Sequence, residues 1–406
     1  MKIVIVSNHF SSHEGGATAI AFEQAKLLIK AGHQVFVFTA ANSAGDIGWQ
    51  DENNLKIYRV RTKEARWLTR SYLCLRNLRV EKEFKNFLAK ASPEVIHFHN
   101  LYYQFPFSLI KIARQFSPKV FFTAHDVMPF SYTKLSHFID QKYNLENIDQ
   151  VNYHLTLSEQ FKQSKKAFNP WRNLVIRRYF KYLAKIFSVS GELKKALEQN
   201  GFKNIEVIHN GIDASAWQVS QREIEKLKKE SGLANKKIIL FAGRLSGYKG
   251  TKQIMIAMEE IIKAIPEAVL LVLDSQNNYQ NNQSYVYLAG AVSRAKMKYY
   301  YNLSDLVVVP SICFDSFPTI NLEAMACHRP VIATVFGGSR EVVEDQKTGF
   351  LANPLDTREL VQKIIYLLQK PDVAQTLGEH GYQKIKTDFN QDKWIKEILK
   401  WYYNLL

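Results

Sequence analysis

Short apolar runs alternate with helical patterns through most of the first half of the chain. The runs are rich in Val, Ile and Phe, which is typical of buried strands. The predicted strands are residues 3–7, 35–39, 56–61, 95–99, 120–124, 186–190 and 205–208. Apolar positions spaced for amphipathic helices occupy residues 17–31, 80–90 and 109–116. This alternation predicts a parallel sheet covered by helices on both faces.

The segment from residue 130 to residue 179 interrupts the alternation. It is polar, aromatic and basic, and we interpret it as helices and loops inserted on the sheet. Asn210-Gly211-Ile212-Asp213 is a turn signal, and the charged residues 220–231 predict a surface helix near an interdomain linker.

The same pattern begins again in the second half. The predicted strands there are residues 237–242, 269–274, 286–288, 306–309 and 331–334. Residues 390–406 predict a terminal helix rich in Trp and Tyr. Two α/β domains are expected, because 406 residues exceed one ordinary core and suit two domains of about 200 residues each.

Composition narrows the class of protein. Hydrophobic residues make up 46% of the chain, which indicates folded domains rather than disorder. The formal charge of +16 favours a phosphate-bearing partner, which can be nucleic acid, anionic lipid or a nucleotide. The three cysteines are odd in number and form no C-x-x-C pair. They therefore favour a reducing compartment over a disulfide framework or a zinc site.

The start of the chain does not have the pattern of a signal peptide. The sequence MKIVIVSNHF leads from a short apolar run directly into a loop, as a first strand does. No apolar stretch reaches the roughly 18 residues that a membrane span needs. We expect a cytoplasmic protein, with peripheral association at the inner face of the cell membrane.

The richest motif is PSICFDSFPTINLEAMACHRPVI at residues 310–332, where a strand, a loop and a helix follow one another. Ligands bind outside the carboxyl ends of parallel strands, and a helix N-terminus near Thr319 suits a phosphate. Asp315 and Glu323 bracket this turn, and their carboxylates can accept hydrogen bonds from vicinal hydroxyls of a sugar or ribose. The alternative is a loop cap and a surface helix residue.

A second motif, FAGRLSGYKG at residues 241–250, also joins a strand to a helix. Arg244 can bind a diphosphate as a bidentate fork and Lys249 as a point charge. As an isolated pair, they can equally be two solvated loop charges.

Two weaker motifs lie in the first half. Gly15-Gly16 follows the first strand and can let the backbone approach a ligand, although G-x-G-x-x-G is absent. His125-Asp126 ends one strand, and His97 and His99 end another on the same side. These histidines can instead be satisfied by neighbouring backbone. No third ligand completes a metal site with them.

Together, these strings resemble the retaining glycosyltransferases of the GT-B fold, in particular glycosyltransferase family 4. Residues 315–323 resemble its E-x7-E signature with Asp for the first Glu, and residues 243–250 resemble its G-R-L-x-x-x-K-G string. His125-Asp126 resembles its H-D loop, and residues 337–350 resemble its downstream loop. Pro318 and His328 stand where the family usually has Gly.

The resemblance implies an α/β protein with the GT-B fold, in which two Rossmann-like domains face each other across a cleft. Residues 1–213 are the expected acceptor-binding domain, and residues 214–387 are the expected nucleotide-sugar-binding domain. Residues 388–406 are expected to form a C-terminal helix that crosses back to the first domain.

The resemblance also implies the roles of the site residues. Glu323 is expected to bind the ribose and Asp315 the transferred sugar. The implied catalytic residues are His125, Glu323, Asp315, Arg244 and Lys249. The implied donor-binding residues are Gly16, Arg244, Lys249, Asp315, Phe317, Pro318, Thr319, Ile320 and Glu323. The implied acceptor-side residues are His99, His125 and Asp126.

The implied reaction is transfer of a hexose from a UDP- or GDP-sugar to an acceptor hydroxyl with retention of configuration. The expected role is cell-surface polysaccharide or glycolipid synthesis, with a glycan or lipid-linked acceptor. No cofactor or metal is expected, because the sequence contains no Asp-x-Asp and offers cations for the diphosphate instead. The alternatives are an epimerase or glycan phosphorylase of the same fold, or a basic nucleic-acid-binding protein, although no nucleic-acid motif is visible.

Basic and aromatic residues are interleaved in two stretches of the first half, which predicts docking on an anionic membrane. An ordinary solvated face with buried aromatics is the alternative. The first stretch contains Arg59, Arg61, Lys63, Arg66, Arg70, Arg76 and Arg79 with Trp67, Tyr72 and Leu73. The second contains Lys162, Lys165, Lys166, Arg172, Arg177 and Arg178 with Trp171 and Tyr179.

Overall fold

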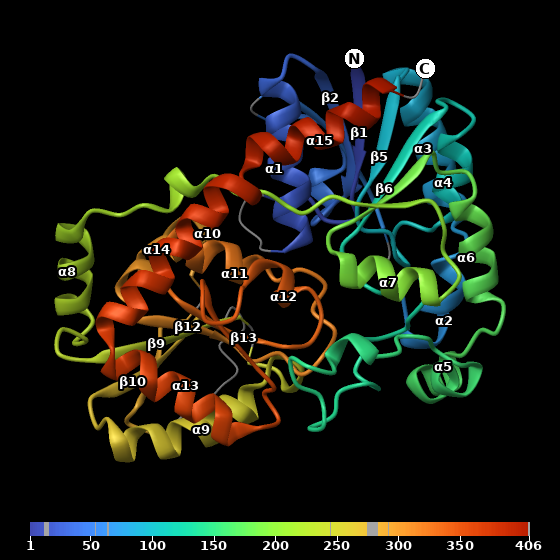
Figure 1. Ribbon diagram of the computed structural model, residues 1–406. Helices are drawn as coiled ribbons and strands as arrows, with labels where there is room; N and C mark the ends of the chain where they lie inside the picture. Colours follow the sequence, from blue (N-terminus) through green and yellow to red (C-terminus); the bar gives the residue numbers. More distant parts are fainter. Residues whose placement is uncertain are drawn as a thin grey trace. The chain divides into compact units, whose positions relative to one another are not determined.

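The chain divides into two units, each built around one sheet (Figure 1). This computed structural model describes residues 1–11, 16–52, 54–62, 65–243, 245–273, 283–290 and 292–404. Unit 1 comprises Met1–Lys134, Asn152–His209 and Ile395–Leu406. Unit 2 comprises Leu135–Val151 and Asn210–Trp394.

The sheet of unit 1 has the strand order β3-β4-β2-β1-β5-β6-β7-β8. All neighbours are parallel except β3 and β4, which are antiparallel. Apart from the exposed Lys2, the central strands β1 and β5 are buried, as expected for a sheet covered on both faces. The bounds are β1 Lys2–Val6, β2 Gln34–Ala40, β3 Gly48–Glu52, β4 Leu55–Val60, β5 Val95–Phe98, β6 Lys119–Ala124, β7 Lys185–Ser188 and β8 Ile205–Val207.

Alternate residues of β5 show which helices cover which face of this sheet. His97 contacts Gln24 of α1 and Tyr402 of α15, whereas Phe98 packs against Phe84 of α3. Figure 1 shows the same division, with α1 and α15 on one side of β1, β5 and β6 and α3 on the other. The helices of this unit are α1 Ala17–Lys30, α2 Trp67–Leu73, α3 Leu78–Ala91, α4 Ser108–Ala113, α5 Leu157–Ser164, α6 Arg172–Phe180 and α7 Gly191–Gln199. The later part of α15, Gln391–Asn404, also belongs to it.

The sheet of unit 2 is parallel throughout, with the order β11-β10-β9-β12-β13-β14. The strands are β9 Lys237–Ala242, β10 Ala268–Leu273, β11 Val286–Leu288, β12 Leu306–Val309, β13 Val331–Thr334 and β14 Gly349–Ala352. The helices are α8 Gln221–Glu230, α9 Thr251–Ala264, α10 Arg294–Leu303, α11 Thr319–Ala326, α12 Ser339–Val342, α13 Thr357–Gln369 and α14 Pro371–Asp388.

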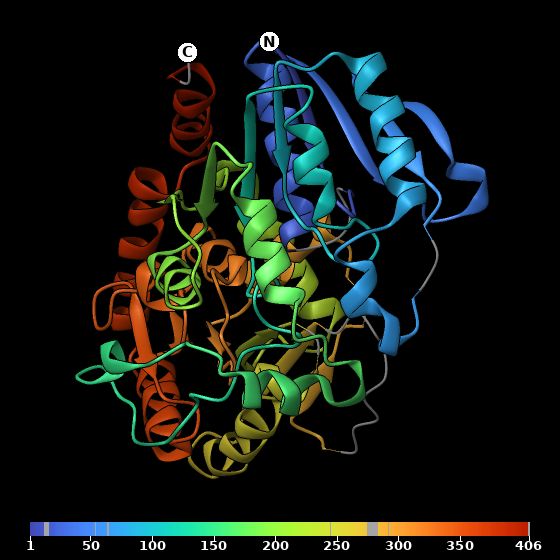
Figure 2. The ribbon, with the colours of Figure 1, turned by 90° about the vertical axis from the view of Figure 1, so that its right-hand side faces the viewer.

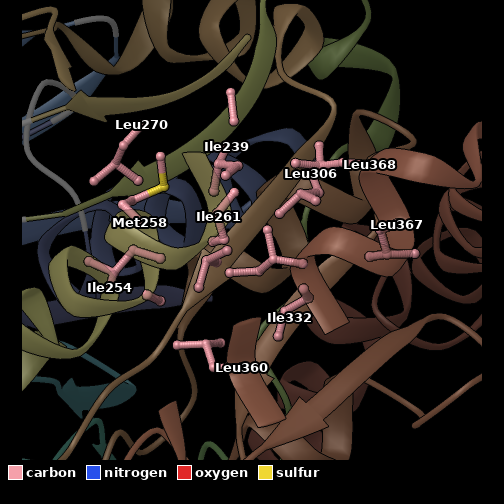
Figure 3. Close-up of a cluster of buried hydrophobic side chains, with 14 of the residues drawn as sticks. Ile239, Ile254, Met258, Ile261, Leu270, Leu306, Ile332, Leu360, Leu367 and Leu368 are labelled. Atoms are coloured by element: carbon pink, nitrogen blue, oxygen red, sulfur yellow. The ribbon is translucent and has the colours of Figure 1, made fainter. Parts of the chain in front are cut away.

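One apolar cluster fixes the helices α9 and α13 on this sheet. Ile239, Leu270, Leu306 and Ile332 come from four of its strands (Figure 3). The helical members labelled there are Ile254, Met258 and Ile261 of α9 and Leu360, Leu367 and Leu368 of α13. Because these residues are buried together, they fix the positions of β9 and β12, whose following loops carry the sequence motifs.

The chain order reverses beside β9, and this reversal locates a binding edge. From β9 the chain proceeds outward through β10 and β11, and then returns to β12 on the other flank of β9. The loops that follow β9 and β12 therefore lie at the edge where open parallel sheets bind ligands, outside the carboxyl ends of the strands. The motif at residues 241–250 begins at the end of β9, and the motif at residues 310–332 begins directly after β12.

The boundaries differ from the expected ones in one important place. The predicted first domain, residues 1–213, contains Leu135–Val151, which belongs to unit 2. The remaining crossings lie between residues 209 and 210 and within α15, after Trp394. The expected insertion at residues 130–179 is thus divided, because α5 and α6 belong to unit 1. Figure 2 shows this region as the green segments of the ribbon.

Candidate functional site

The two loops at the carboxyl ends of β9 and β12 lie directly against each other. The backbone N–H of Ile312 donates to the carbonyl of Tyr248 at 3.0 Å. Gly250 has φ of 76°, and a Cβ atom there would be 1.9 Å from the carbonyl oxygen of Pro310. Glycine is therefore required at residue 250 both by its conformation and by this close approach.

Lys249 and Asp315 form an ion pair across these loops. Lys249 Nζ is 2.5 Å from Asp315 Oδ2, and Ser311 Oγ donates to the same oxygen at 3.2 Å. The Asp315 carbonyl accepts the N–H of Gly338 at 2.9 Å, and a Cβ on Gly337 would be 2.3 Å from that carbonyl. The structure thus brings together two predicted residues, and the Gly337-Gly338 turn supports the backbone of one of them.

Glu323 lies on α11 and is almost completely buried, with 2% of its side chain exposed. Arg294 Nη1 is 3.0 Å from its Oε1, and the Tyr301 hydroxyl donates to its Oε2 at 2.8 Å. Burial, followed by the charge of Glu323, holds the pKa of Tyr301 well above its usual range, so Tyr301 stays protonated. A carboxylate can accept about four hydrogen bonds, so Glu323 keeps acceptor capacity for a ligand.

Arg294 and Tyr301 were not among the predicted site residues. Both come from α10 and are seven residues apart, so they lie on one face of that helix. Arg294 also lies over the ring of Trp217, 5.7 Å from its centroid. The helical spacing was visible in the sequence, but nothing in it indicated that this face meets Glu323.

The first turn of α11 offers backbone N–H donors between Asp315, in the preceding loop, and Glu323, on the same helix. Pro318 is the N-cap, and no side chain caps the helix. The N–H groups of Thr319 and Ile320 have no acceptor among the described residues, as is usual for a first turn. The side chain of Phe317 is buried, and its ring centroid is 5.8 Å from that of Phe389. Phe317 thus packs inward, whereas the helix N-terminus remains open for an anion.

Arg244 and Gly16 are the two remaining predicted donor residues. Arg244 lies outside the described residues, as does Gly15 of the glycine pair. Gly16 is the N-cap of α1 with φ of 65°, and a Cβ there would have no atom within 4 Å. The structure therefore explains this glycine by its left-handed backbone and not by a close approach within the chain.

Three histidines form a stacked row at the ends of β5 and β6 in unit 1. The ring of His99 lies between those of His97 and His125, with centroid distances of 4.8 and 5.2 Å. His97 Nε2 is 2.7 Å from Thr123 Oγ1, and its Nδ1 meets the hydroxyl of Tyr402. His99 Nδ1 is 2.9 Å from His125 Nε2.

Burial keeps this row neutral. It lowers the pKa of His97 and His125 to about 3, and that of His99 well below the usual range. His99 Nε2 is buried and has no partner among the described residues. A buried acceptor without a partner is better tolerated than a buried N–H donor, so we assign the shared proton to His99 Nδ1. His125 then carries its own proton on Nδ1.

Asp126 follows His125 in the sequence, but its carboxylate binds the backbone and not the His125 ring. Its Oδ1 accepts the backbone N–H of Met128 at 2.9 Å, and burial raises the pKa of its carboxyl. The contact to His125 comes from His99 instead. The proposed acceptor-side residues His99, His125 and Asp126 are therefore adjacent in unit 1, but only the two histidines are bonded to each other.

A cavity of about 390 Å³ lies at the other edge of the unit 2 sheet. Lys237, Asp305 and Pro330 line it, and they stand at the amino ends of β9, β12 and β13. Its opposite charges are balanced, because Arg329 and Lys237 face Asp305 and Glu379. This cavity is thus distinct from the edge that carries Lys249, Asp315 and Glu323.

Two features are lacking in the described residues, a cluster of metal ligands and a helix able to span a membrane. Within them, no three or more His, Cys, Asp or Glu side chains cluster in a way that could hold a metal ion. None of the helices in these parts of the chain has the length and apolar character that crossing a membrane demands.

Two family profiles match the chain. The profile described as "Glycosyltransferase Family 4" matches residues 14–216, which are half of the 406 residues. The profile described as "Glycosyl transferases group 1" matches residues 223–384. The two matches lie on either side of residues 217–222 and together include every strand of both sheets except β1.

Curated relatives are similar over part of their length. Spore coat protein SA of Bacillus subtilis (strain 168) is 25% identical over 216 residues, which are 48% of this chain and 57% of that protein. An uncharacterized glycosyltransferase of Methanocaldococcus jannaschii is 25% identical over 298 residues, 70% of this chain and 74% of that protein. The match thus spans little more than half of the first relative.

Solved structures share the fold at low identity. Sucrose-phosphate synthase from Thermosynechococcus elongatus has a TM-score of 0.77 and 20% identity, over 99% of this chain and 98% of that chain. Anabaena HepE in complex with UDP-glucose has a TM-score of 0.68 and 18% identity, over 98% of both chains. The likeness therefore covers nearly the whole molecule.

Proposed function

The chain belongs to glycosyltransferase family 4 and has the GT-B fold, and from this premise we propose that it transfers a sugar from a nucleotide-sugar donor to an acceptor hydroxyl. The observation that carries the proposal is the group formed by Lys249, Asp315 and Glu323 at one edge of the unit 2 sheet. A cation, two carboxylates and an open helix N-terminus together match the parts of a nucleotide sugar.

Each part of the donor has a matching group in unit 2. The Lys249 ammonium and the first-turn N–H groups of α11 suit the diphosphate. Glu323 accepts hydrogen bonds from the ribose hydroxyls, and Asp315 accepts them from the transferred sugar. HepE, a structural neighbour, is described in complex with UDP-glucose, which supports a UDP-hexose as the first donor to test.

The proposed chemistry is retention of the anomeric configuration with electrostatic stabilisation of the leaving diphosphate. Lys249, Arg244 and the α11 dipole neutralise the charge that develops as the glycosidic bond breaks. His125 is neutral and donates from Nδ1 on the acceptor side in unit 1. We propose that these fixed cations replace a divalent metal, and that the acceptor is a glycan or lipid-linked hydroxyl of a cell-surface polymer or glycolipid.

A thermal-shift screen of nucleotide sugars tests the donor site. A ligand that binds only the folded state stabilises it by about 2.7 kcal/mol at a concentration of 100 Kd. We expect one UDP- or GDP-hexose to raise the melting temperature of the wild type but not of Lys249→Met. Lys252→Met is the matched control, because Lys252 is an exposed lysine on α9.

Turnover of that donor then tests the reaction and its metal requirement. Transfer to an acceptor, with unchanged rate in excess EDTA, is the expected result. Conversion of the donor sugar without an acceptor would favour an epimerase instead. Complete loss in EDTA, restored by magnesium or manganese, would contradict the role given to the cations.

Exposed apolar side chains gather on three helices of unit 1, which supports docking on an anionic membrane. Ser71 Oγ of α2 donates to Ala167 O at 2.7 Å, and Asn169 Nδ2 donates to Ser71 O, so α2 contacts the segment between α5 and α6. We call this region the α2–α5–α6 surface. Its exposed apolar residues are Trp67, Leu68, Tyr72, Leu157, Phe161, Trp171 and Leu174.

The basic residues of the predicted clusters are only partly on this surface. Arg66, Lys162, Lys165, Lys166 and Arg178 are exposed. Arg172 is buried and donates to the carbonyl of Met128. Arg59 is also buried and pairs with Glu52. Lys63 lies outside the described residues.

Sedimentation with vesicles tests the membrane proposal. Each basic residue near an anionic surface contributes about 1 kcal/mol, and aromatic residues suit the interface. We expect binding to phosphatidylserine vesicles that weakens with salt and falls about tenfold in Trp67→Ser/Trp171→Ser. Tyr366→Ser, at an exposed tyrosine of α13 in unit 2, is the control. Equal binding to neutral and anionic vesicles would contradict the proposal.

A further inference from the structure

The segment Leu135–Val151, here called the strap, follows β6 of unit 1 in sequence but packs within unit 2. Asn353, buried just after β14, donates through Nδ2 to the carbonyls of Asp140 at 2.9 Å and Tyr143 at 2.8 Å. Near the other end of the strap, Arg340 Nη1 of α12 is 2.8 Å from Asp149 Oδ1. The strap is therefore held by side chains of the donor-binding unit along its length.

The strap also reaches the loop that carries Asp315. The N–H of Phe314 donates to the carbonyl of Leu135 at 2.7 Å. The ring of Phe138 meets those of Phe314 and Phe336 edge-on, with centroid distances of 6.2 and 5.9 Å. All three rings are buried. Edge-to-face aromatic contacts at such distances stabilise a specific arrangement of the rings.

The rings that Phe138 contacts precede the two backbone segments on which Asp315 depends. Phe314 directly precedes Asp315, and Phe336 directly precedes Gly337 and Gly338, whose N–H holds the Asp315 carbonyl. A buried side chain between these two segments fixes the distance between them, because protein interiors are close-packed. The position of the Asp315 carboxylate is therefore set partly by the strap.

We propose that the strap is a specificity-determining element for the transferred sugar. It positions Asp315, whose carboxylate accepts hydrogen bonds from the sugar hydroxyls. Glu323 and the N-terminus of α11 bind the nucleotide. This inference rests on the proposed function, since it assigns the transferred sugar to Asp315. The strap contacts the loop of Asp315, whereas Glu323 and the first turn of α11 bind the nucleotide. A change in the strap should therefore alter the choice of sugar more than the affinity for the nucleotide, which it reaches only through the ion pair of Asp315 with Lys249.

The test uses Phe138→Ala, the conservative Phe138→Leu and the anchor variant Asn353→Ala in the full-length chain. Gln141→Ala is the matched control, because the exposed side chain of Gln141 lies on the strap and only its carbonyl contacts Asn353. For each protein, kcat/KM is measured with the preferred UDP- or GDP-hexose and with its C4 epimer. The Kd of the free nucleoside diphosphate is measured alongside.

A misplacement of about 1 Å in a reacting group can cost about 100-fold in rate. We expect Phe138→Ala and Asn353→Ala to lower kcat/KM for the preferred donor about tenfold or more. The preference over the epimer should fall at least about fivefold, with nucleotide Kd within about twofold of wild type. Phe138→Leu should retain most of the preference, and Gln141→Ala all of it.

Different results overturn different statements. An unchanged donor preference in folded Phe138→Ala and Asn353→Ala variants contradicts the strap proposal and leaves the proposed function intact. A parallel loss of affinity for both donors and for the nucleotide also contradicts the strap proposal, because the strap then has only a structural role. A wild type that turns over no nucleotide sugar contradicts the proposed function and the strap proposal with it.

Discussion

Replacing Glu323 by glutamine is expected to lower kcat/KM at least about 100-fold, which is the largest effect we anticipate from one side chain. A hydrogen bond to a charged group contributes roughly 1.5–3 kcal/mol, and two ribose hydroxyls are available to this carboxylate. Glutamine keeps the shape of the side chain but removes its charge and one acceptor oxygen. Steady-state kinetics with the donor found in the screen measures the loss.

A control variant separates this effect from general removal of a surface charge. Glu260→Gln alters an exposed glutamate of α9 whose carboxylate is 2.7 Å from Lys263, and it should leave kcat/KM unchanged. If Glu323→Gln retains nearly the wild-type kcat/KM, the assignment of Glu323 to the ribose is wrong.

Glu323→Gln could also lower kcat/KM by leaving Arg294 without its ion-pair partner. A double variant distinguishes this cause from the loss of ribose binding. Glu323→Gln leaves the Arg294 guanidinium, 18% exposed, without its carboxylate partner, which can disturb the site by itself. If that disturbance is the cause, adding Arg294→Met to Glu323→Gln should restore activity. If the carboxylate binds ribose, the double variant should stay inactive.

The central strands of both sheets could be predicted from the sequence because burial on two faces demands continuous apolar runs. The runs at residues 3–7, 95–99 and 306–309 correspond to β1, β5 and β12. Gly48–Glu52, the strand β3, was not predicted, because it is an antiparallel edge strand with no buried member and a single large apolar residue, Trp49. An exposed edge needs no apolar alternation, so it leaves no periodic signal.

The loops of the candidate site were predictable for a related reason. Residues that follow neighbouring parallel strands meet at one edge, so the motifs after β9 and β12 had to lie close together. The same argument places His99 and His125 side by side after β5 and β6. It does not predict that one ring bonds to the other, because this depends on side-chain rotamers.

The strap and α10 show what the sequence could not predict. Leu135–Val151 has no distinctive composition, and its contacts with the rest of unit 2 include backbone carbonyls that accept from Asn353, more than 200 residues away. Backbone acceptors are the same at every residue, so no pattern of side chains reveals such a contact. Arg294 likewise lies 29 residues before its partner Glu323, and only the tertiary packing of α10 on α11 joins them.

Acidification is expected to destabilise unit 1 well before its carboxylates titrate, because of the buried histidine row. The pKa of His97 in the folded chain is about 3, whereas an unfolded histidine has a pKa of about 6.5. The folded state therefore binds fewer protons than the unfolded state between these values. The stability that neutral His97 contributes is fully present above about pH 6.5 and is lost as the pH falls through this window. His99 shifts in the same direction.

Each such histidine makes the free energy of unfolding fall by about 1.4 kcal/mol per pH unit within the window. Asp126 acts in the opposite direction, since burial raises its pKa and its protonation at low pH relieves a cost. The polar groups that meet the His97 ring are Thr123, Gln24 and Tyr402, and burial keeps the pKa of Tyr402 well above its usual range. None of these three is a carboxylate that could compensate a protonated His97.

Urea unfolding between pH 7.5 and pH 5 measures this dependence before most carboxylates titrate. We expect the free energy of unfolding to fall steadily below pH 6.5 in the wild type. In His97→Gln, the free energy of unfolding should depend less steeply on pH, by the amount that corresponds to about one proton. The stability of this variant at pH 7.5 is the reference for its own values at lower pH. His380→Gln, at an exposed histidine of α14, is the matched control and should keep the wild-type slope. A free energy of unfolding that is constant from pH 7.5 to pH 5 would mean that these histidines titrate alike in the folded and unfolded states, which would contradict a row kept neutral by burial.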